Sequence, residues 1–257
     1  MHNAGVTERE IQAAIDLSAQ RDFSTSLALY QGMLPRAKTT LDRMKILFGI
    51  ITCSTWLKLD AIAENAVQEL KQLPDFEVSR AFVVTTQAAA YIDFGRAQEA
   101  LELIDINLSS EVLQRDDFRD WKYEHLFLKG RSLVQLARYD EALCAFDSAR
   151  GIEPDGKFET LMLIERSNCF IAFGRYGEAH DAASQVLARG DAEMATLAMQ
   201  YMAECDLGLG RASDALKLYA EIETRLPSSL IQEERIQTGI KNAMAYLEKL
   251  HPQGKPS

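Results

Sequence analysis

The chain has 257 residues and a formal net charge of −10, with 38 acidic and 28 basic side chains. An acidic surface repels phosphate backbones and anionic lipid headgroups, which argues against nucleic acid or a membrane surface as a partner. The hydrophobic fraction of 47% and the charged fraction of 26% are typical of a folded protein, and 14 glycines and 6 prolines are too few for an all-β chain rich in tight turns.

The first predicted element is a helix that begins after Thr7. The stretch Thr7–Glu10 has the form of a capping box, in which the threonine and glutamate side chains satisfy the first free backbone amides. Apolar residues with helical spacing follow at Ile11, Ala14, Ile15 and Leu17. No basic region followed by an apolar run precedes this helix, and no segment reaches the roughly 18 apolar residues of a membrane span, so a cytoplasmic protein is expected.

Further along the chain, a seven-residue pattern recurs four times. Each copy has a small residue, an arginine, two variable residues, an acidic residue and an alanine, and the copies begin at Gly95, Ala137, Gly174 and Gly210. The alanines Ala100, Ala142, Ala179 and Ala215 are 42, 37 and 36 residues apart. Steps of 37 residues before Ala100 reach Ala63 and then Ser26, so six units fit one register.

This pattern resembles the tetratricopeptide repeat (TPR), a unit of about 34 residues that folds as two antiparallel helices. The best match is Tyr123–Gly156, in which Gly130 takes the small place of the first helix and Ala142 the small place of the second. The resemblance implies an all-α fold, a right-handed α-α superhelix (TPR-like solenoid) of about six helix pairs with a C-terminal capping helix.

The resemblance covers residues 7–227, with degenerate units over 7–78 and clearer units over 79–227. The enlarged spacing of 42 residues is explained by the polar stretch 108–120, as a longer loop or an extra helical turn. Residues 228–250 are predicted to form the capping helix, because apolar residues share one of its faces. The tail 251–257 is expected to be disordered.

Signatures of catalysis or of cofactor binding are missing from the sequence, which has no phosphate loop, dinucleotide fingerprint, serine elbow or zinc-protease motif. His125 and His180 fall on helices of different units, and the acidic stretch around Asp116 lacks the glycine and spacing of a calcium loop. The cysteines form no Cys-x-x-Cys pair, and they are interpreted as buried apolar thiols: Cys53, Cys144, Cys169 and Cys205. We therefore expect no enzyme, no cofactor and no metal.

In TPR proteins the first helix of each unit lines a concave groove that receives a segment of the partner. Carried onto this register, the resemblance implies a partner-binding groove formed by Phe48, Thr52, Trp56, Phe82, Thr86, Phe127, Arg131, Gln135, Asn168 and Tyr201. For each aromatic residue the alternative is ordinary packing between helices. A carboxylate clamp of the chaperone-binding kind is not expected, because only Arg131 and Asn168 offer donors for an anion at the clamp positions.

The leading functional hypothesis is a non-catalytic interaction module: an adaptor, scaffold or dedicated chaperone that binds another protein or a peptide. A second hypothesis is a ligand-sensing regulator that binds a short peptide or a small molecule. A third is a self-assembling structural subunit, in which the chain forms a homo-oligomer. An enzyme would require a constellation assembled from distant helices that the sequence does not display.

Overall fold

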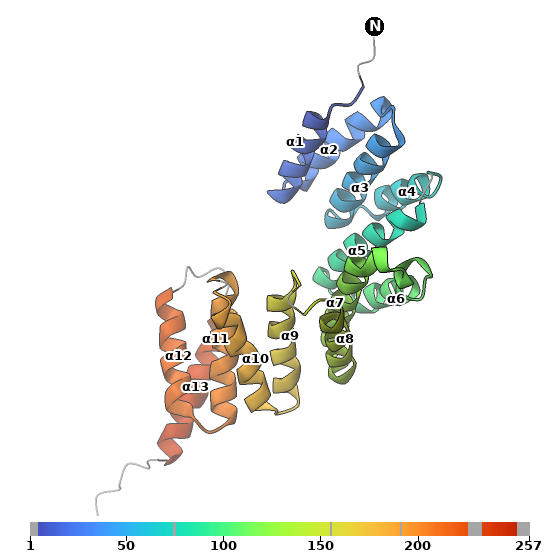
Figure 1. Ribbon diagram of the computed structural model, residues 1–257. Helices are drawn as coiled ribbons and strands as arrows, with labels where there is room; N and C mark the ends of the chain where they lie inside the picture. Colours follow the sequence, from blue (N-terminus) through green and yellow to red (C-terminus); the bar gives the residue numbers. More distant parts are fainter. Residues whose placement is uncertain (1–4, 74–75, 155, 191, 226–232, 251–257) are drawn as a thin grey trace, which may run out of the picture. The chain divides into compact units, whose positions relative to one another are not determined.

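The computed structural model describes residues 5–73, 76–154, 156–190, 192–225 and 233–250. Over these residues the chain forms thirteen α-helices and no strand (Figure 1). The predicted all-α fold is therefore confirmed. The chain divides into two compact units, Met1–Leu136 and Ala137–Ser257, which we call unit 1 and unit 2. The predicted disordered tail 251–257 lies outside the described residues, as does the start of the predicted capping helix.

Unit 1 stacks its helices in two layers. The odd-numbered helices form one layer, in which α3 packs on α1 and α5, and α5 packs on α7. On the other side, α2 and α4 pack against α3, while α6 packs against α5 and α7 (Figure 1). The elements are α1 Glu8–Ala19, α2 Phe23–Met33, η1 Leu34–Arg36, α3 Thr40–Trp56, α4 Asp60–Leu70, α5 Phe76–Asp93, α6 Ala97–Leu108, η2 Val112–Gln114, η3 Asp116–Phe118 and α7 Arg119–Gln135.

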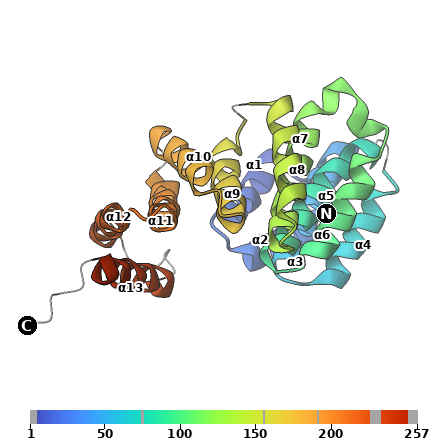
Figure 2. The same cartoon turned by 90° about the horizontal axis from the view of Figure 1, so that it is seen from below.

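Unit 2 repeats this arrangement. The helix α10 packs against both α9 and α11, α12 packs against α11 and α13, and α8 packs against α9 (Figure 2). Contacts of α11 with α9 and with α13 complete the odd-numbered layer. The elements are α8 Tyr139–Ile152, α9 Glu159–Ala172, α10 Tyr176–Ala188, α11 Ala192–Gly208, α12 Ala212–Arg225 and α13 Glu233–Leu250. The last of these lies within the range predicted for the capping helix.

The turn after each first helix of a pair contains one residue in the left-handed region. These residues are Arg21 (φ 63°), Lys58 (φ 58°), Gly95 (φ 75°), Ala137 (φ 56°), Gly174 (φ 68°) and Gly210 (φ 76°), at steps of 37, 37, 42, 37 and 36 residues. At Gly95 the amide of the next residue, Arg96, donates to the carbonyl oxygen of Tyr91 at 2.7 Å, the bond that closes a Schellman cap. A left-handed residue therefore recurs in all six turns, including the two whose sequence pattern is weakest.

Small residues sit five positions after each left-handed residue, near the start of the helix that follows the turn. Ser26, Ala63, Ala100, Ala142, Ala179 and Ala215 are each at most 4% exposed. The hydroxyl of Ser26 donates a hydrogen bond to the carbonyl oxygen of Ala14 at 2.8 Å. In unit 2, the hydroxyl of Ser167 donates to the carbonyl oxygen of Ala179 at 2.8 Å. Because each hydroxyl is satisfied by the facing helix, serine can replace alanine here at little cost.

At two junctions between pairs, an aromatic ring packs on a glycine. A Cβ atom added to Gly49 of α3 would lie 2.2 Å from the ring of Tyr30 in α2. In unit 2, a Cβ on Gly239 of α13 would lie 2.2 Å from the hydroxyl oxygen of Tyr219 in α12. Within unit 2, α13 thus meets the preceding helix as α3 does in unit 1, in the place of a further first helix.

The connector 109–118 explains the enlarged step between repeats. It forms the two 3-10 turns η2 and η3 rather than an extended loop, and it buries Leu113 (1% exposed) and Phe118 (5% exposed) against Ala81 of α5. The connector is therefore part of the core of unit 1.

The thiols correct one sequence prediction. Cys53, Cys169 and Cys205 are buried, but Cys144 is exposed. It lies on α8 beside the buried Leu143 and Ala145, at a position of the helix that faces solvent.

None of the described helices is long and apolar enough to cross a membrane.

Candidate partner-binding face

The helix α3 separates its core residues from a second, partly open side. Leu47, Ile50 and Ile51 are at most 4% exposed, whereas Phe48 and Thr52 are half-buried. Residues four apart lie on the same side of a helix, so Phe48 and Thr52 share that open side. On α5 the half-buried residues include Phe82, Thr85, Thr86 and Ala89, and on α7 they include Trp121 and Arg131. We call this side of α3, α5 and α7 the first-helix face of unit 1.

Three aromatic rings cross this face from helix to helix. The ring centroids of Phe48 in α3 and Phe82 in α5 are 4.3 Å apart, with the ring planes at 37°. Phe82 in turn meets Trp121 of α7 edge to face, at 6.1 Å and 81°. These are favourable geometries for aromatic pairs. All three rings are only half-buried, so together they offer a connected apolar surface over three helices.

Two cations of the first-helix face are paired with carboxylates of neighbouring helices. The ammonium group of Lys45 in α3 lies 2.8 Å from the Glu8 carboxylate of α1. The guanidinium group of Arg131 in α7 lies 3.4 Å from the Asp93 carboxylate of α5 and 6.0 Å from the centre of the Phe127 ring. The amide of Gln135 donates to the carbonyl oxygen of Ile92 at 2.9 Å. Polar side chains of this face therefore also join successive first helices.

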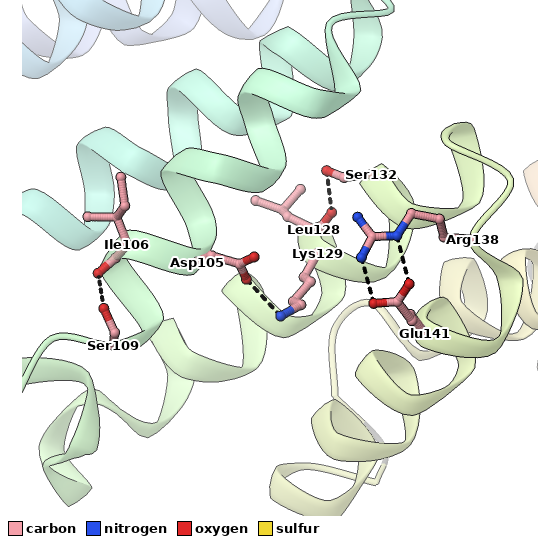
Figure 3. Close-up of polar contacts among 8 residues, drawn as sticks. All are labelled: Asp105, Ile106, Ser109, Leu128, Lys129, Ser132, Arg138 and Glu141. Carbon is pink, nitrogen blue, oxygen red and sulfur yellow. Dashed lines mark hydrogen bonds and ion pairs between the residues drawn. The ribbon is translucent and has the colours of Figure 1, made fainter.

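A separate ion pair joins α7 to α6. The Lys129 ammonium group lies 2.7 Å from the Asp105 carboxylate of α6 (Figure 3). The hydroxyl of Ser132 donates to the carbonyl oxygen of Leu128 one turn earlier in α7 (Figure 3). The Lys129–Asp105 pair thus links α7 to α6, whereas the Ser132 bond lies within α7.

One polar atom of the first-helix face is left without a partner in the described part of the chain. The Thr85 hydroxyl oxygen is buried and makes no hydrogen bond, whereas Thr55 on α3 donates to the carbonyl oxygen of Ile51 at 2.6 Å. A buried polar atom without a partner costs about 1–3 kcal/mol. Such atoms are uncommon in native proteins.

The structure distributes the sequence-predicted residues over several settings. Phe48, Thr52, Phe82, Thr86 and Arg131 lie on the first-helix face, with Gln135 at the end of α7. Phe127 is on α7 but only 2% exposed, so its ring has little area to offer. Asn168 on α9 is half-buried, and Tyr201 on α11 is 7% exposed in the core of unit 2, packed with Leu163 and Ala198. Contact with a partner stays a prediction for each of them.

Trp56 belongs to a different cluster of unit 1. Its ring stacks on Phe23 of α2 at 5.7 Å and 4°, and meets Phe94 edge to face at 5.8 Å. Lys58 places its ammonium group 4.5 Å from the centre of the Phe94 ring. This cluster lies at the turns between the helices of each pair, because Trp56 ends α3 and Phe23 begins α2.

Trp121 is the residue of the first-helix face that sequence reasoning missed. It lies directly after the connector, in the stretch where the repeat spacing departs from 37 residues, so the register did not place it on any helix. The apolar spacing of Leu113, Phe118 and Trp121 was the available signal, because it indicates a folded connector that leads into the helix.

Burial keeps His125, Cys169 and Cys205 in their uncharged forms. Burial lowers the pKa of His125 to about 4, so its imidazole is neutral at pH 7. Burial likewise raises the pKa of Cys169 and of Cys205 to about 12, so both remain protonated thiols and poor nucleophiles. In the described ranges, no three His, Cys, Asp or Glu side chains gather in a way that could hold a metal ion.

No protein-family model matches this sequence, and no curated protein matches it. Solved structures of TPR proteins do match. A signal transduction ATPase with a TPR sensor, from Pyrococcus horikoshii, aligns with 95% of this chain at a TM-score of 0.72 and 16% identity. A Rap protein complexed with competence and sporulation factor aligns over 95% of this chain and 75% of its own chain, with a TM-score of 0.59 and 17% identity. A TPR protein from Parabacteroides merdae aligns over 97% of this chain and 94% of its own chain, with a TM-score of 0.59 and 13% identity.

These likenesses show the fold, which is a TPR-like helical repeat. The chain spans 39% of the length of the ATPase, so the activity of that whole protein does not carry over to it.

Proposed function

We propose that this chain is a non-catalytic interaction module that holds a segment of a partner protein, or a peptide, on the first-helix face of unit 1. The observation that carries the proposal is the row of half-buried rings Phe48, Phe82 and Trp121. Aromatic residues supply much of the binding energy at protein interfaces, and rings already fixed against each other lose little freedom on binding. An adaptor, a scaffold and a dedicated chaperone all fit this mode of action.

The Rap protein supports the proposal by analogy. It shares this fold and was solved in complex with competence and sporulation factor, so a repeat stack of this kind can hold a factor. The analogy concerns the fold only, because the two sequences are 17% identical.

End-to-end self-assembly is less favoured by the outer faces of the terminal helices. On α1, the exposed residues Arg9, Gln12 and Asp16 occupy the repeat positions at which α3 packs on α2. If Gly239 of α13 is matched to Gly49 of α3, the exposed Gln237 and Lys241 take the places of the buried Leu47 and Ile51. Polar residues at these places oppose further stacking, as in the terminal repeats of other solenoids.

A sensor is the second candidate function, and the similarity to a Pyrococcus horikoshii ATPase that has a TPR sensor favours it. In that case the chain would bind a small molecule or short peptide and pass the signal to another protein. A ligand that binds only the folded chain raises its stability by RT ln(1 + [L]/Kd), so thermal shift with candidate metabolites and peptides detects it.

Affinity capture from native extract tests the leading proposal, with the double variant Phe48→Ala/Phe82→Ala compared to wild type. The matched control is Phe173→Ala, because Phe173 of unit 2 is also aromatic and 40% exposed. A protein captured by wild type and by the control, but lost with the double variant, supports the proposal. Equal capture by all three would place the interface elsewhere.

A further inference from the structure

The first-helix face of unit 1 also indicates the chemistry of the segment it would hold; this inference rests on the proposed function. We propose that the partner segment is an uncharged stretch that presents two or more aromatic or aliphatic side chains to the rings of Phe48, Phe82 and Trp121. The alternatives are a charged tract and a terminal carboxylate, which use ion pairs with the repeat.

The apolar part of the argument is the extent of the ring surface. The centroid distances of 4.3 Å and 6.1 Å make one continuous surface from α3 to α7. Along α1, the next first helix of the unit, Ile15 is 45% exposed at the repeat position that Thr52 takes on α3. A surface of this length accepts more than one apolar side chain, which a segment in extended or helical form supplies at regular spacing.

The electrostatic part of the argument is that two cations of this face are already paired with carboxylates. Lys45 is paired with Glu8, and Arg131 is paired with Asp93. Each pair holds one cation and one anion, so neither leaves a net charge to attract an ionic ligand. A ligand carboxylate would have to replace Asp93 at Arg131 and leave that aspartate without its cation, which cancels much of the gain.

The ion pair of Arg131 also agrees with the expectation that the chain has no carboxylate clamp. Arg131 was one of two residues that could serve an anion, and its guanidinium group is shared between Asp93 and the ring of Phe127. The other, Asn168, belongs to unit 2. Within unit 1, the first-helix face therefore favours apolar recognition even though the whole chain carries a net charge of −10.

A displayed library of random peptides, selected against the full chain, tests the proposal. The enriched peptides are synthesised, and their Kd is measured at low and high NaCl, with about a tenfold range of concentration to vary screening. We expect sequences with at least two aromatic or aliphatic residues, a Kd that changes by less than about twofold with salt, and a loss of about tenfold or more in Phe82→Ala. Phe173→Ala should bind as wild type does.

Because Phe82 packs between two other rings, its truncation also weakens unit 1. Urea denaturation followed by tryptophan fluorescence checks that the variant is folded under assay conditions. The variant Phe82→Leu adds a second test, since it keeps apolar volume but removes the ring; it should bind with intermediate affinity.

The possible failures are distinguishable. Peptides rich in acidic or basic residues, with a Kd that weakens about tenfold in high salt and is still lost in Phe82→Ala, would overturn the uncharged segment and leave the proposed function standing. Peptides that bind Phe82→Ala as tightly as wild type, or a library with no enriched peptide, would overturn both.

Discussion

Mild acid should destabilise unit 1 through a single residue, His125. Its ring is fully buried between α6 and α7, where Nδ1 lies 2.7 Å from the Trp121 carbonyl oxygen and Nε2 lies 2.8 Å from the Asn107 amide nitrogen. Because a carbonyl oxygen only accepts, Nδ1 carries the proton, and Nε2 accepts from Asn107. In a protonated imidazole both nitrogens are donors, so Nε2 could no longer accept the hydrogen bond from Asn107. This arrangement therefore requires neutral imidazole.

The size and sign of the effect follow from the pKa of this group. Burial lowers the pKa of His125 from 6.5 to about 4 in the folded chain. Above pH 6.5 the ring is neutral in both states; as the pH falls from 6.5 towards 4, the unfolded chain takes up a proton that the folded chain does not. At 1.4 kcal/mol per unit, the free energy of unfolding should fall by about 2 kcal/mol between pH 7.5 and pH 5.

The chain offers a selective probe for this measurement. Both of its tryptophans, Trp56 and Trp121, lie in unit 1, so urea denaturation followed by tryptophan fluorescence reports on that unit. The variant His125→Gln keeps an amide oxygen for Asn107 but cannot titrate, and His180→Gln in unit 2 serves as the matched control.

Wild type and the control should lose about 2 kcal/mol more than His125→Gln between the two pH values. Carboxylates contribute at lower pH: hydrogen bonds from Arg36 and Thr7 lower the pKa of Glu10 from 4.5 to about 2, so its stabilisation is lost only below pH 4.5. Equal losses in all three proteins would refute the assignment of His125 as the buried neutral group.

Two further predictions concern the backbone. Gly49→Ala should destabilise unit 1 by about 1–3 kcal/mol, because the added Cβ would meet the Tyr30 ring. Gly32→Ala on α2 places its Cβ in open space and should stabilise the unit by roughly 0.5–1 kcal/mol. Urea denaturation of the two variants compares these effects. In the repeated turn, Ala137→Gly should stabilise the folded chain by about 1–2 kcal/mol and Gly174→Ala should destabilise it by a similar amount, because both positions have φ near 60°. Calorimetry measures the change in Tm of each variant. Changes of the same sign in both variants would contradict the left-handed turn.

Much of the fold could be predicted from sequence because it depends on short-range rules. The spacing of the small residue identified Ser26 and Ala63, although the second unit keeps little else of the repeat pattern. The left-handed residues Arg21 and Lys58 then fall five positions earlier, where neither residue type suggests positive φ. Tertiary context overrides residue preference there.

The candidate site was less predictable, because it depends on contacts between pairs. The spacing places Phe48 and Phe82 on first helices, but their ring contact arises from the packing of α3 on α5. The spacing also places Trp56 on a first helix, yet its ring packs on Phe23 and Phe94 near the turns. Neither outcome is encoded in the spacing of one helix.

Hydrogen–deuterium exchange tests the central claim most directly, with the full chain measured alone and with the peptide that binds it most tightly. The account predicts slower exchange in α3, α5 and α7 of unit 1, little change in α9 and α11 of unit 2, and loss of the effect in Phe48→Ala/Phe82→Ala. Protection confined to unit 2, or to the even-numbered helices of unit 1, would contradict the assignment of the first-helix face as the partner-binding surface.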